Sequence, residues 1–170
     1  MDFLKLAGER YSSREYKTTP VPVEKMEYIL EAVRIAPTGC NSQQIKVLAI
    51  TSSEGLKRAA ECSECTYGAP AVLIFCYDKN HPDSFLPGRN EVNVGLTDAC
   101  IAATHAMLAA KEQGLDTCWV CWFYEDKTIE TFELPEGLVP ALFMPLGYAA
   151  DGPSERHFIR KPIDEIVDFI

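Results

Sequence analysis

The alternation of apolar and polar positions along the chain predicts a mixture of helices and strands. A helix is expected over residues 23–35, because Met26, Ile29 and Val33 recur at helical spacing and share one face. Residues 71–77 form a continuous apolar run, which is typical of a central strand buried on both faces. The two patterns together favour a sheet that is covered by helices.

The longest helix is expected over residues 92–113, with Gly114 as its cap. Its side chains are small nearly all the way round, which allows a neighbouring helix to pack closely. We therefore expect this helix in the core or at a subunit interface. The small residues are Ala99, Cys100, Ala102, Ala103, Ala106, Ala109 and Ala110.

Shorter elements follow from the same periodicities and from the positions of proline and glycine. Helices are expected at residues 2–8, 54–60, 127–132 and 162–170, and strands at 46–51, 117–123 and 139–148, the last interrupted by Pro145. Polar or proline-rich loops are expected at 36–44 and 78–90, the second of them mobile by composition. No repeat or linker divides the chain, so residues 1–170 are expected to form one domain.

Composition narrows the choice of partners. The 170 residues are 47% hydrophobic, which is enough for one sizeable core. The formal charge of −9 argues against nucleic acid or an anionic membrane as a partner. No stretch resembles a signal peptide or is long enough to cross a bilayer, so we expect a cytoplasmic protein.

Against this acidic background, a short basic segment near the N-terminus is informative. In an extended segment Arg10, Ser12 and Arg14 point to one side, and Tyr11 and Ser13 point to the other. Guanidinium groups bind phosphate through charge-assisted and often two-pronged hydrogen bonds, and a hydroxyl adds a donor between them. We call Arg10, Ser12 and Arg14 the arginine clamp and interpret it as a phosphate site; an ordinary solvated turn is the alternative.

Several motifs, in chain order, resemble one known family. They are Arg10-Tyr11-Ser12-Ser13-Arg14-Glu15-Tyr16, Ala36-Pro37-Thr38-Gly39-Cys40-Asn41-Ser42-Gln43, Asp98 with the alanine-rich helix and Gly114-Leu115-Asp116-Thr117-Cys118-Trp119, Leu146-Gly147-Tyr148, and Arg160-Lys161-Pro162. The set resembles the nitroreductase family of FMN-dependent oxidoreductases over nearly the whole chain. Each motif is weak alone, and their order gives the resemblance its weight.

The resemblance implies an α+β fold with three α/β/α layers, a mostly antiparallel central sheet and an intertwined homodimer. It also implies two FMN sites at the dimer interface and reduction of nitroaromatic, quinone or related electron-poor acceptors by NAD(P)H. Hydride would pass from nicotinamide to flavin N5 and then to the acceptor in a ping-pong sequence, with no catalytic side chain. The work of the protein would be positioning and electrostatics.

The same resemblance implies a set of FMN-binding residues. Arg10 and Arg160 would meet the phosphate, and Arg14 would lie near the pyrimidine edge of the flavin. The loop at residues 37–41 would line the ring or come from the other subunit, and the strand near Cys121 would offer a backbone N–H to N5. The implied residues are Arg10, Tyr11, Ser12, Arg14, Pro37, Thr38, Asn41, Gln43, Cys121, Trp122, Leu146, Gly147 and Arg160.

Two departures from the family pattern leave a second hypothesis open. Gln44-Ile45 stands where relatives often have Pro-Trp, and Cys121-Trp122 stands where relatives often have glycine after an aromatic residue. The segment between Thr117 and Leu146 is also short, so we expect an open site. The alternative function is a non-catalytic flavin- or ligand-binding protein of the same fold.

Other polar residues have competing interpretations. The pairs Cys62/Cys65 and Cys118/Cys121 have the double C-x-x-C form of a zinc site, which defines a third hypothesis, a zinc-stabilised module. We favour free thiols for all seven cysteines. We expect a structural hydrogen bond for Asp98, and His157 is a candidate for helping with phosphate.

Overall fold

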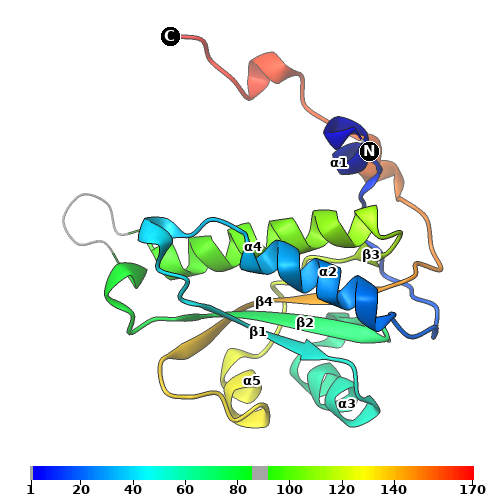
Figure 1. Cartoon of the computed structure of the whole chain (residues 1–170). Coiled ribbons are helices and arrows are strands. Elements are labelled where there is room, and N and C mark those ends of the chain that lie inside the picture. The colour runs from blue at the N-terminus through cyan, green and yellow to red at the C-terminus, as the bar shows by residue number, and fades with distance from the viewer. Residues whose placement is uncertain (1, 86–91) are drawn as a thin grey trace.

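A four-stranded antiparallel sheet lies between two layers of helices in the computed structural model, which describes residues 2–85 and 92–170 (Figure 1). The strands are β1 (Ile45–Ile50), β2 (Ala71–Asp78), β3 (Asp116–Thr117) and β4 (Leu138–Gly147), in the order β1-β2-β4-β3. The helices are α1 (Phe3–Glu9), α2 (Val23–Arg34), α3 (Ser53–Cys62), α4 (Val94–Glu112) and α5 (Glu125–Thr131). The predicted α+β class and its layered arrangement are confirmed.

Strand β2 is the centre of the core, as its apolar sequence predicts. It pairs with β1 on one side and β4 on the other, and Ala71 to Cys76 are fully buried. Leu73 and Phe75 belong to the core beneath α2 and α4, whereas Val72 and Ile74 belong to the core shared with α3. A strand with helices on both faces has no polar face, which explains the unbroken apolar run.

Helices α2 and α4 form the upper layer in Figure 1. Met26, Ile29 and Val33 of α2 are buried against α4, and the alanines of α4 let the two helices approach closely. Helix α4 begins where the Asn93 side chain accepts a hydrogen bond from the Leu96 N–H at 2.9 Å. It ends at Glu112, and Gly114 just beyond it has a φ of 72°, the left-handed conformation that commonly follows a helix end.

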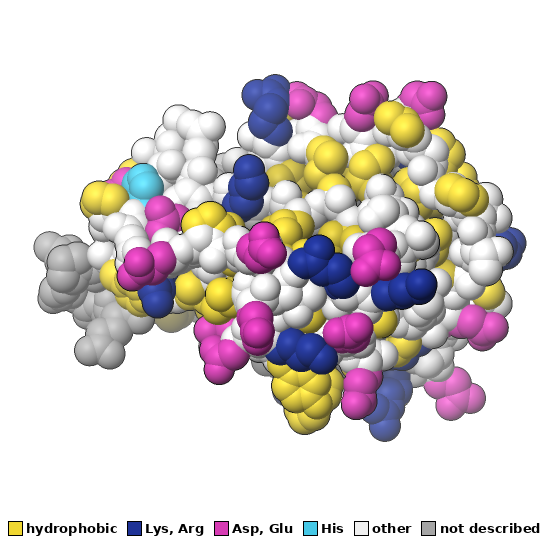
Figure 2. Space-filling model, turned by 90° about the horizontal axis from the view of Figure 1, so that it is seen from below, with side chains coloured by type: hydrophobic (Ala, Val, Ile, Leu, Met, Phe, Trp, Pro, Cys, Tyr) yellow, Lys and Arg dark blue, Asp and Glu magenta, His cyan; other side chains and the backbone are white. Residues whose placement is uncertain are grey.

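Helices α3 and α5 cover the opposite face of the sheet, which is the lower layer in Figure 1. Ala59 and Cys62 of α3 are fully buried beneath the sheet. Figure 2 shows this side of the molecule with acidic and basic side chains interspersed and hydrophobic side chains between them. The two signs of charge are mixed on the described part of this face, so positive charge is not concentrated there.

The predicted strand at residues 117–123 is wrong, and so is the predicted interruption of 139–148. Strand β4 runs without a break through Pro145, while β3 ends at Thr117. The Cys118 N–H donates to Pro145 O at 3.3 Å, but proline has no N–H to return the bond. Pairing resumes only at an isolated bridge between Val120 and Phe143. Pro145 therefore ends the neighbouring strand β3, while its own strand β4 continues.

The predicted helix at 162–170 is also wrong. Only Ile163–Glu165 forms a single helical turn, and the residues around it are exposed. A helix this short is unstable without a surface on which to pack. In the predicted loop 78–90, Pro82–Ser84 forms a helical turn, and residues 86–90 lie outside the described residues.

Across residues 2–85 and 92–170, none of the helices combines the length and the apolar character that a bilayer crossing requires.

Candidate functional site

The arginine clamp lies on an extended segment, as the sequence predicts. Hydrogen bonds on two sides hold this segment against the end of the sheet. On one side the Ser13 N–H donates to Thr117 O at 3.1 Å. On the other, the Lys17 N–H donates to Tyr148 O at 2.8 Å, and the Ala150 N–H donates to Glu15 O at 2.8 Å. The side chains therefore alternate in direction along a fixed backbone.

A cavity of about 490 Å³ opens beside this segment. Its lining residues come from the clamp segment and from the chain that follows β4, and they are Arg10, Tyr11, Ser12, Arg14, Ser154, Arg156 and His157. Three guanidinium groups and several hydroxyl groups therefore surround one space. This donor set suits a multiply charged oxyanion such as a phosphate monoester.

The cavity concentrates positive charge. Burial lowers the pKa of Arg10, and the nearby charge of Arg160 lowers it further. The Arg160 guanidinium donates to Ile159 O at 2.8 Å, and one ring nitrogen of His157 lies 2.9 Å from Gly8 O. An anion placed between the arginines would remove their mutual repulsion.

Several side chains of this cavity were not in the set that the resemblance implied. Ser154 and Arg156 line the cavity, and His157, considered only as a candidate, lines it too. The basic composition of residues 156–161 was the available signal for Arg156. Ser154 had no signal in the sequence, because only the fold brings it opposite the clamp.

Asp151, which does not line the cavity, holds the clamp segment in place. The Asp151 carboxylate accepts a hydrogen bond from the Ser13 hydroxyl at 2.6 Å and from the Arg14 backbone N–H at 2.8 Å. The Tyr11 hydroxyl donates to Asp151 O at 2.9 Å. No pattern in the sequence indicates that Asp151 contacts this segment, since 137 positions separate it from Arg14.

Arg14 also borders a small group of thiol and phenol side chains. One of its guanidinium nitrogens donates to Ser12 O at 3.3 Å. Burial raises the pKa of the Cys118 thiol, while the charge of Arg14 and a hydrogen bond from Ser12 oppose that rise. Burial also raises the pKa of Tyr67, and hydrogen bonding to Arg14 works against it. The Arg14 charge therefore acts on Cys118 and Tyr67 as well as on the cavity.

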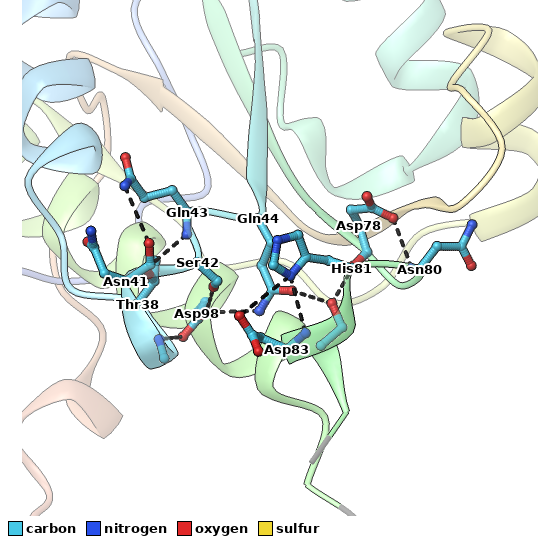
Figure 3. Close-up of polar contacts among 12 residues, drawn as sticks. Thr38, Asn41, Ser42, Gln43, Gln44, Asp78, Asn80, His81, Asp83 and Asp98 are labelled. Carbon is cyan, nitrogen blue, oxygen red and sulfur yellow. Dashed lines mark hydrogen bonds and ion pairs between the residues drawn. The ribbon is translucent and has the colours of Figure 1, made fainter. Parts of the chain in front are cut away.

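A second group of implied site residues lies in the loop between α2 and β1 (Figure 3). Thr38, Asn41 and Gln43 belong to this loop, and the Gln43 N–H donates to the Thr38 hydroxyl at 3.1 Å. Asn41 and Gln43 have φ values of 55° and 52°, which are uncommon outside glycine and asparagine. Both side chains are exposed at the surface, as is Pro37.

The loop is fixed to α4 by a buried polar network (Figure 3). Asp98 is only 2% exposed, and its carboxylate accepts hydrogen bonds from the Gly39 N–H at 2.9 Å and from the Gln44 side-chain amide at 3.1 Å. The Gln44 amide oxygen accepts a hydrogen bond from the Ser84 hydroxyl. The predicted structural role of Asp98 is confirmed. Gln44, one of the departures from the family pattern, is a buried link between the loop and two other segments.

The two groups of residues lie at opposite ends of α4. The loop contacts the start of the helix at Asp98, and the clamp contacts Thr117, shortly after its end. The 19 residues of α4 span about 28 Å. Among the described residues, no hydrogen bond joins the two groups.

The remaining implied residues are dispersed. Cys121 is exposed and accepts a hydrogen bond from the Trp119 indole N–H at 3.2 Å, and Trp122 is 74% exposed. The Leu146 side chain is fully buried in the core, which leaves only its backbone for a ligand. At Gly147, a side chain would collide with Pro70 at 2.7 Å.

The cysteines of the zinc hypothesis do not converge. In the described parts of the chain, no group of three or more histidine, cysteine or acidic side chains is arranged to hold a metal ion. The Cys62 thiol is buried and faces Lys127 O at 3.9 Å, whereas Cys121 is exposed. The cysteines in the described residues are all free thiols.

Comparisons with known proteins agree with the fold and the motifs. The model of the nitroreductase family matches residues 7–66 and 62–148. An FMN reductase [NAD(P)H] of Bacillus subtilis strain 168 is 31% identical over 166 residues, which cover 88% of this chain and 67% of that protein.

Solved structures give the same result. A nitroreductase family protein from Clostridium difficile 630 has a TM-score of 0.91 and 36% identity, covering 99% of this chain and 98% of its own. A chain from Exiguobacterium sibiricum 255-15, solved in complex with FMN, has a TM-score of 0.85 and 24% identity, covering 100% of this chain and 98% of its own. The second likeness is one of fold.

Proposed function

The chain belongs to the nitroreductase family, and from this we propose that it binds FMN and uses it to pass electrons from NAD(P)H to small electron-poor acceptors. Nitroaromatic compounds and quinones are the acceptor classes that we propose. Bound FMN would supply the redox chemistry, taking up a hydride and passing it on. The protein residues would bind, orient and electrostatically bias that group.

The single observation that carries the proposal is the basic cavity at the arginine clamp. Arg10, Arg14 and Arg156 line it, in a chain with a formal charge of −9. Burial and the nearby charge of Arg160 lower the pKa of Arg10, and a bound anion would offset both effects. The FMN phosphate is a dianion with three acceptor oxygens, so the residues present fit the group.

Each clamp residue has its own part in this proposal. Arg10 and Arg160 hold the phosphate by charge-assisted hydrogen bonds, and the Ser12 hydroxyl donates between them. Arg14 presents its charge to the pyrimidine edge of the flavin, where a cation stabilises the reduced form. None of these residues gives or takes a proton in the proposed reaction.

We propose that the complete site requires two copies of the chain. A two-fold axis that packs α4 against its symmetry mate in an antiparallel arrangement brings the loop of one copy to the clamp of the other. Thr38, Asn41 and Gln43 of one copy would then line the flavin bound at the partner's clamp. The outward side of α4 suits such packing, because Leu96, Ile101 and Leu108 are at least partly exposed there.

The carboxyl-terminal arm, residues 158–170, gives independent support for a dimer. It projects away from the rest of the chain in Figure 1, and its apolar side chains are exposed. The side chains of Phe158, Ile159, Ile163, Ile166 and Phe169 are between 67% and 96% exposed. Exposed apolar side chains in this number are typical of a segment that packs on another subunit. We propose that the arm wraps around the partner, as an intertwined homodimer requires.

The short segment after β3 supports a broad choice of acceptors. Between residues 118 and 137 the chain forms a single helix, α5, which lies under the sheet on the side opposite α4. This segment therefore contributes no helix to the upper layer, where the proposed flavin site lies. We propose an open acceptor site that selects by electron affinity more than by shape.

The decisive experiment has two steps. Purified protein should take up FMN on reconstitution, and anaerobic mixing with NADH or NADPH should bleach the flavin absorbance near the visible maximum. A protein that takes up no FMN would contradict the proposal. A bound flavin that neither nicotinamide reduces would favour the non-catalytic flavin-binding alternative.

A further inference from the structure

Asp151 occupies an unusual place beside the arginine clamp. It is a carboxylate next to a cavity lined by Arg10, Arg14 and Arg156, where a negative charge opposes the binding of an anion. Its carboxylate accepts hydrogen bonds from a hydroxyl and a backbone N–H of the clamp segment, and within the described residues it forms no ion pair with a guanidinium. This geometry points to a role for Asp151 that offsets the repulsion between its carboxylate and a bound anion.

Three contacts connect Asp151 to the clamp segment. Its carboxylate oxygens accept from the Ser13 hydroxyl at 2.6 Å and from the Arg14 N–H at 2.8 Å, and its backbone oxygen accepts from the Tyr11 hydroxyl at 2.9 Å. Ser13 is fully buried and Asp151 is partly buried, so water competes less for the bond between them than at the open surface. The three partners of Asp151, which are Tyr11, Ser13 and Arg14, lie within four consecutive residues of one extended segment.

These contacts fix the direction of the clamp residues. In an extended segment, holding the Ser13 side chain on one side directs those of its neighbours Ser12 and Arg14 to the other. A bond to the Arg14 N–H further restrains the backbone from which that guanidinium projects. A phosphate site depends on such restraint, because displacement of a donor by a fraction of an ångström weakens its hydrogen bond.

We propose that Asp151 is a positioning residue for phosphate binding, acting through Ser13 and Arg14 and not by contact with the ligand. The inference rests on the proposed FMN site and adds a residue that neither the motifs nor the cavity lining includes. Its consequence is that Asp151 favours binding of the FMN phosphate although its own charge disfavours it.

Two variants with the same charge separate these effects. Asp151→Asn keeps an oxygen for the Arg14 N–H, and its amide can donate to the Ser13 hydroxyl, whose single proton can then go to Glu15 O. Asp151→Ala loses the same charge and both side-chain bonds. Affinities of the apoprotein for FMN and for riboflavin, which lacks the phosphate, are measured by quenching of flavin fluorescence.

We expect Asp151→Ala to reduce the preference for FMN over riboflavin by about tenfold, and Asp151→Asn to retain that preference. Equal FMN preference in the two variants would overturn the inference, because charge alone would then explain both. An equal loss of FMN and riboflavin binding in Asp151→Ala would also overturn it, since a general loss of structure affects both ligands.

A third variant covers the case in which Asp151→Ala does not fold. Ser13→Ala removes the hydroxyl partner and should reduce the FMN preference in the same direction, whereas an unchanged preference would overturn the role given to Ser13 and Asp151. Asp78→Ala, which removes a carboxylate bonded to the Asn80 N–H elsewhere, is the matched control. A wild-type protein without any preference for FMN would contradict the proposed function itself, which distinguishes the two failures.

Discussion

The Asp98 carboxylate accepts a hydrogen bond from the backbone N–H of Gly39 at 2.9 Å, joining residues 59 positions apart. Replacing Asp98 with alanine leaves the Gly39 N–H and the Gln44 amide buried without an acceptor. We expect Asp98→Ala to lower the free energy of unfolding by about 2–4 kcal/mol, measured by urea denaturation. Glu130→Ala, at an exposed position of α5, is the control and should change it by less than about 0.5 kcal/mol. Similar effects of the two variants would contradict the structural role of Asp98.

Arg10 should contribute strongly to flavin affinity. Arg10→Ala removes one charge-assisted donor from the proposed phosphate site, so FMN affinity should fall by about 10- to 100-fold in a fluorescence titration. Arg58→Ala changes an arginine on α3, where the side chain lies over the Phe132 ring, and should leave the affinity unchanged. An Arg10→Ala protein with wild-type affinity would remove Arg10 from the site. Wild-type affinity should also fall as ionic strength rises.

The tyrosines of the clamp segment predict a loss of stability at alkaline pH. Burial, with the charges of Asp116 and Asp151, raises the pKa of Tyr11 to about 12, and burial raises the pKa of Tyr16 still more strongly. The folded protein therefore holds phenolic protons that the unfolded chain, with an ordinary pKa of 10.0, has already lost. The stability of the folded state is fully present below pH 10 and should decline as the pH rises toward 12.

One variant tests whether Tyr16 contributes to this loss of stability at alkaline pH. Tyr16→Phe loses the hydrogen bonds that its hydroxyl donates to Ser13 O and Pro145 O, so it should be less stable than wild type at pH 8 by about 1 kcal/mol. Its unfolding free energy should then fall less steeply above pH 10. Tyr124→Phe, at an exposed position, should keep the wild-type slope. A wild-type profile that stays flat from pH 9 to 11 would contradict the prediction.

Cys121 offers a probe of the flavin ring. Its thiol is exposed in the described chain and hydrogen-bonded by the Trp119 indole, so a thiol reagent should modify it quickly in the apoprotein. If the backbone near Cys121 lies at flavin N5, FMN should slow that modification, measured by mass spectrometry of the peptide. Cys121→Ser identifies the corresponding kinetic phase. Modification at the same rate with and without FMN would place Cys121 away from the flavin.

A deletion in the carboxyl-terminal arm tests the proposed dimer. Deletion of residues 163–170 removes the exposed Ile163, Ile166 and Phe169, so the monomer fraction should increase in sedimentation velocity experiments. FMN affinity should fall with it, because the proposed site uses both copies. Substitution of Lys161, an exposed charge in the arm, by alanine is the control. An unchanged dimer that binds FMN normally after the deletion would exclude a role for the arm.

The sequence by itself determined the local parts of this protein. Periodicity identified α2 and β2, because an amphipathic helix and a strand buried on both faces have distinct patterns. The alternation of Arg10, Ser12 and Arg14 gave the direction of the clamp, since side chains alternate in any extended segment. The order of the family motifs indicated the fold.

Only the tertiary structure decided which distant residues meet. Pro145 ends its neighbour β3 because it cannot donate across the sheet, and that effect depends on the strand register. The contact of Asp151 with Ser13, and the distance between the clamp and the loop at Asn41, follow from the packing of β4 and α4. Hydrogen bonds between residues more than a hundred positions apart leave no periodicity in the sequence, so the chain alone could not reveal them.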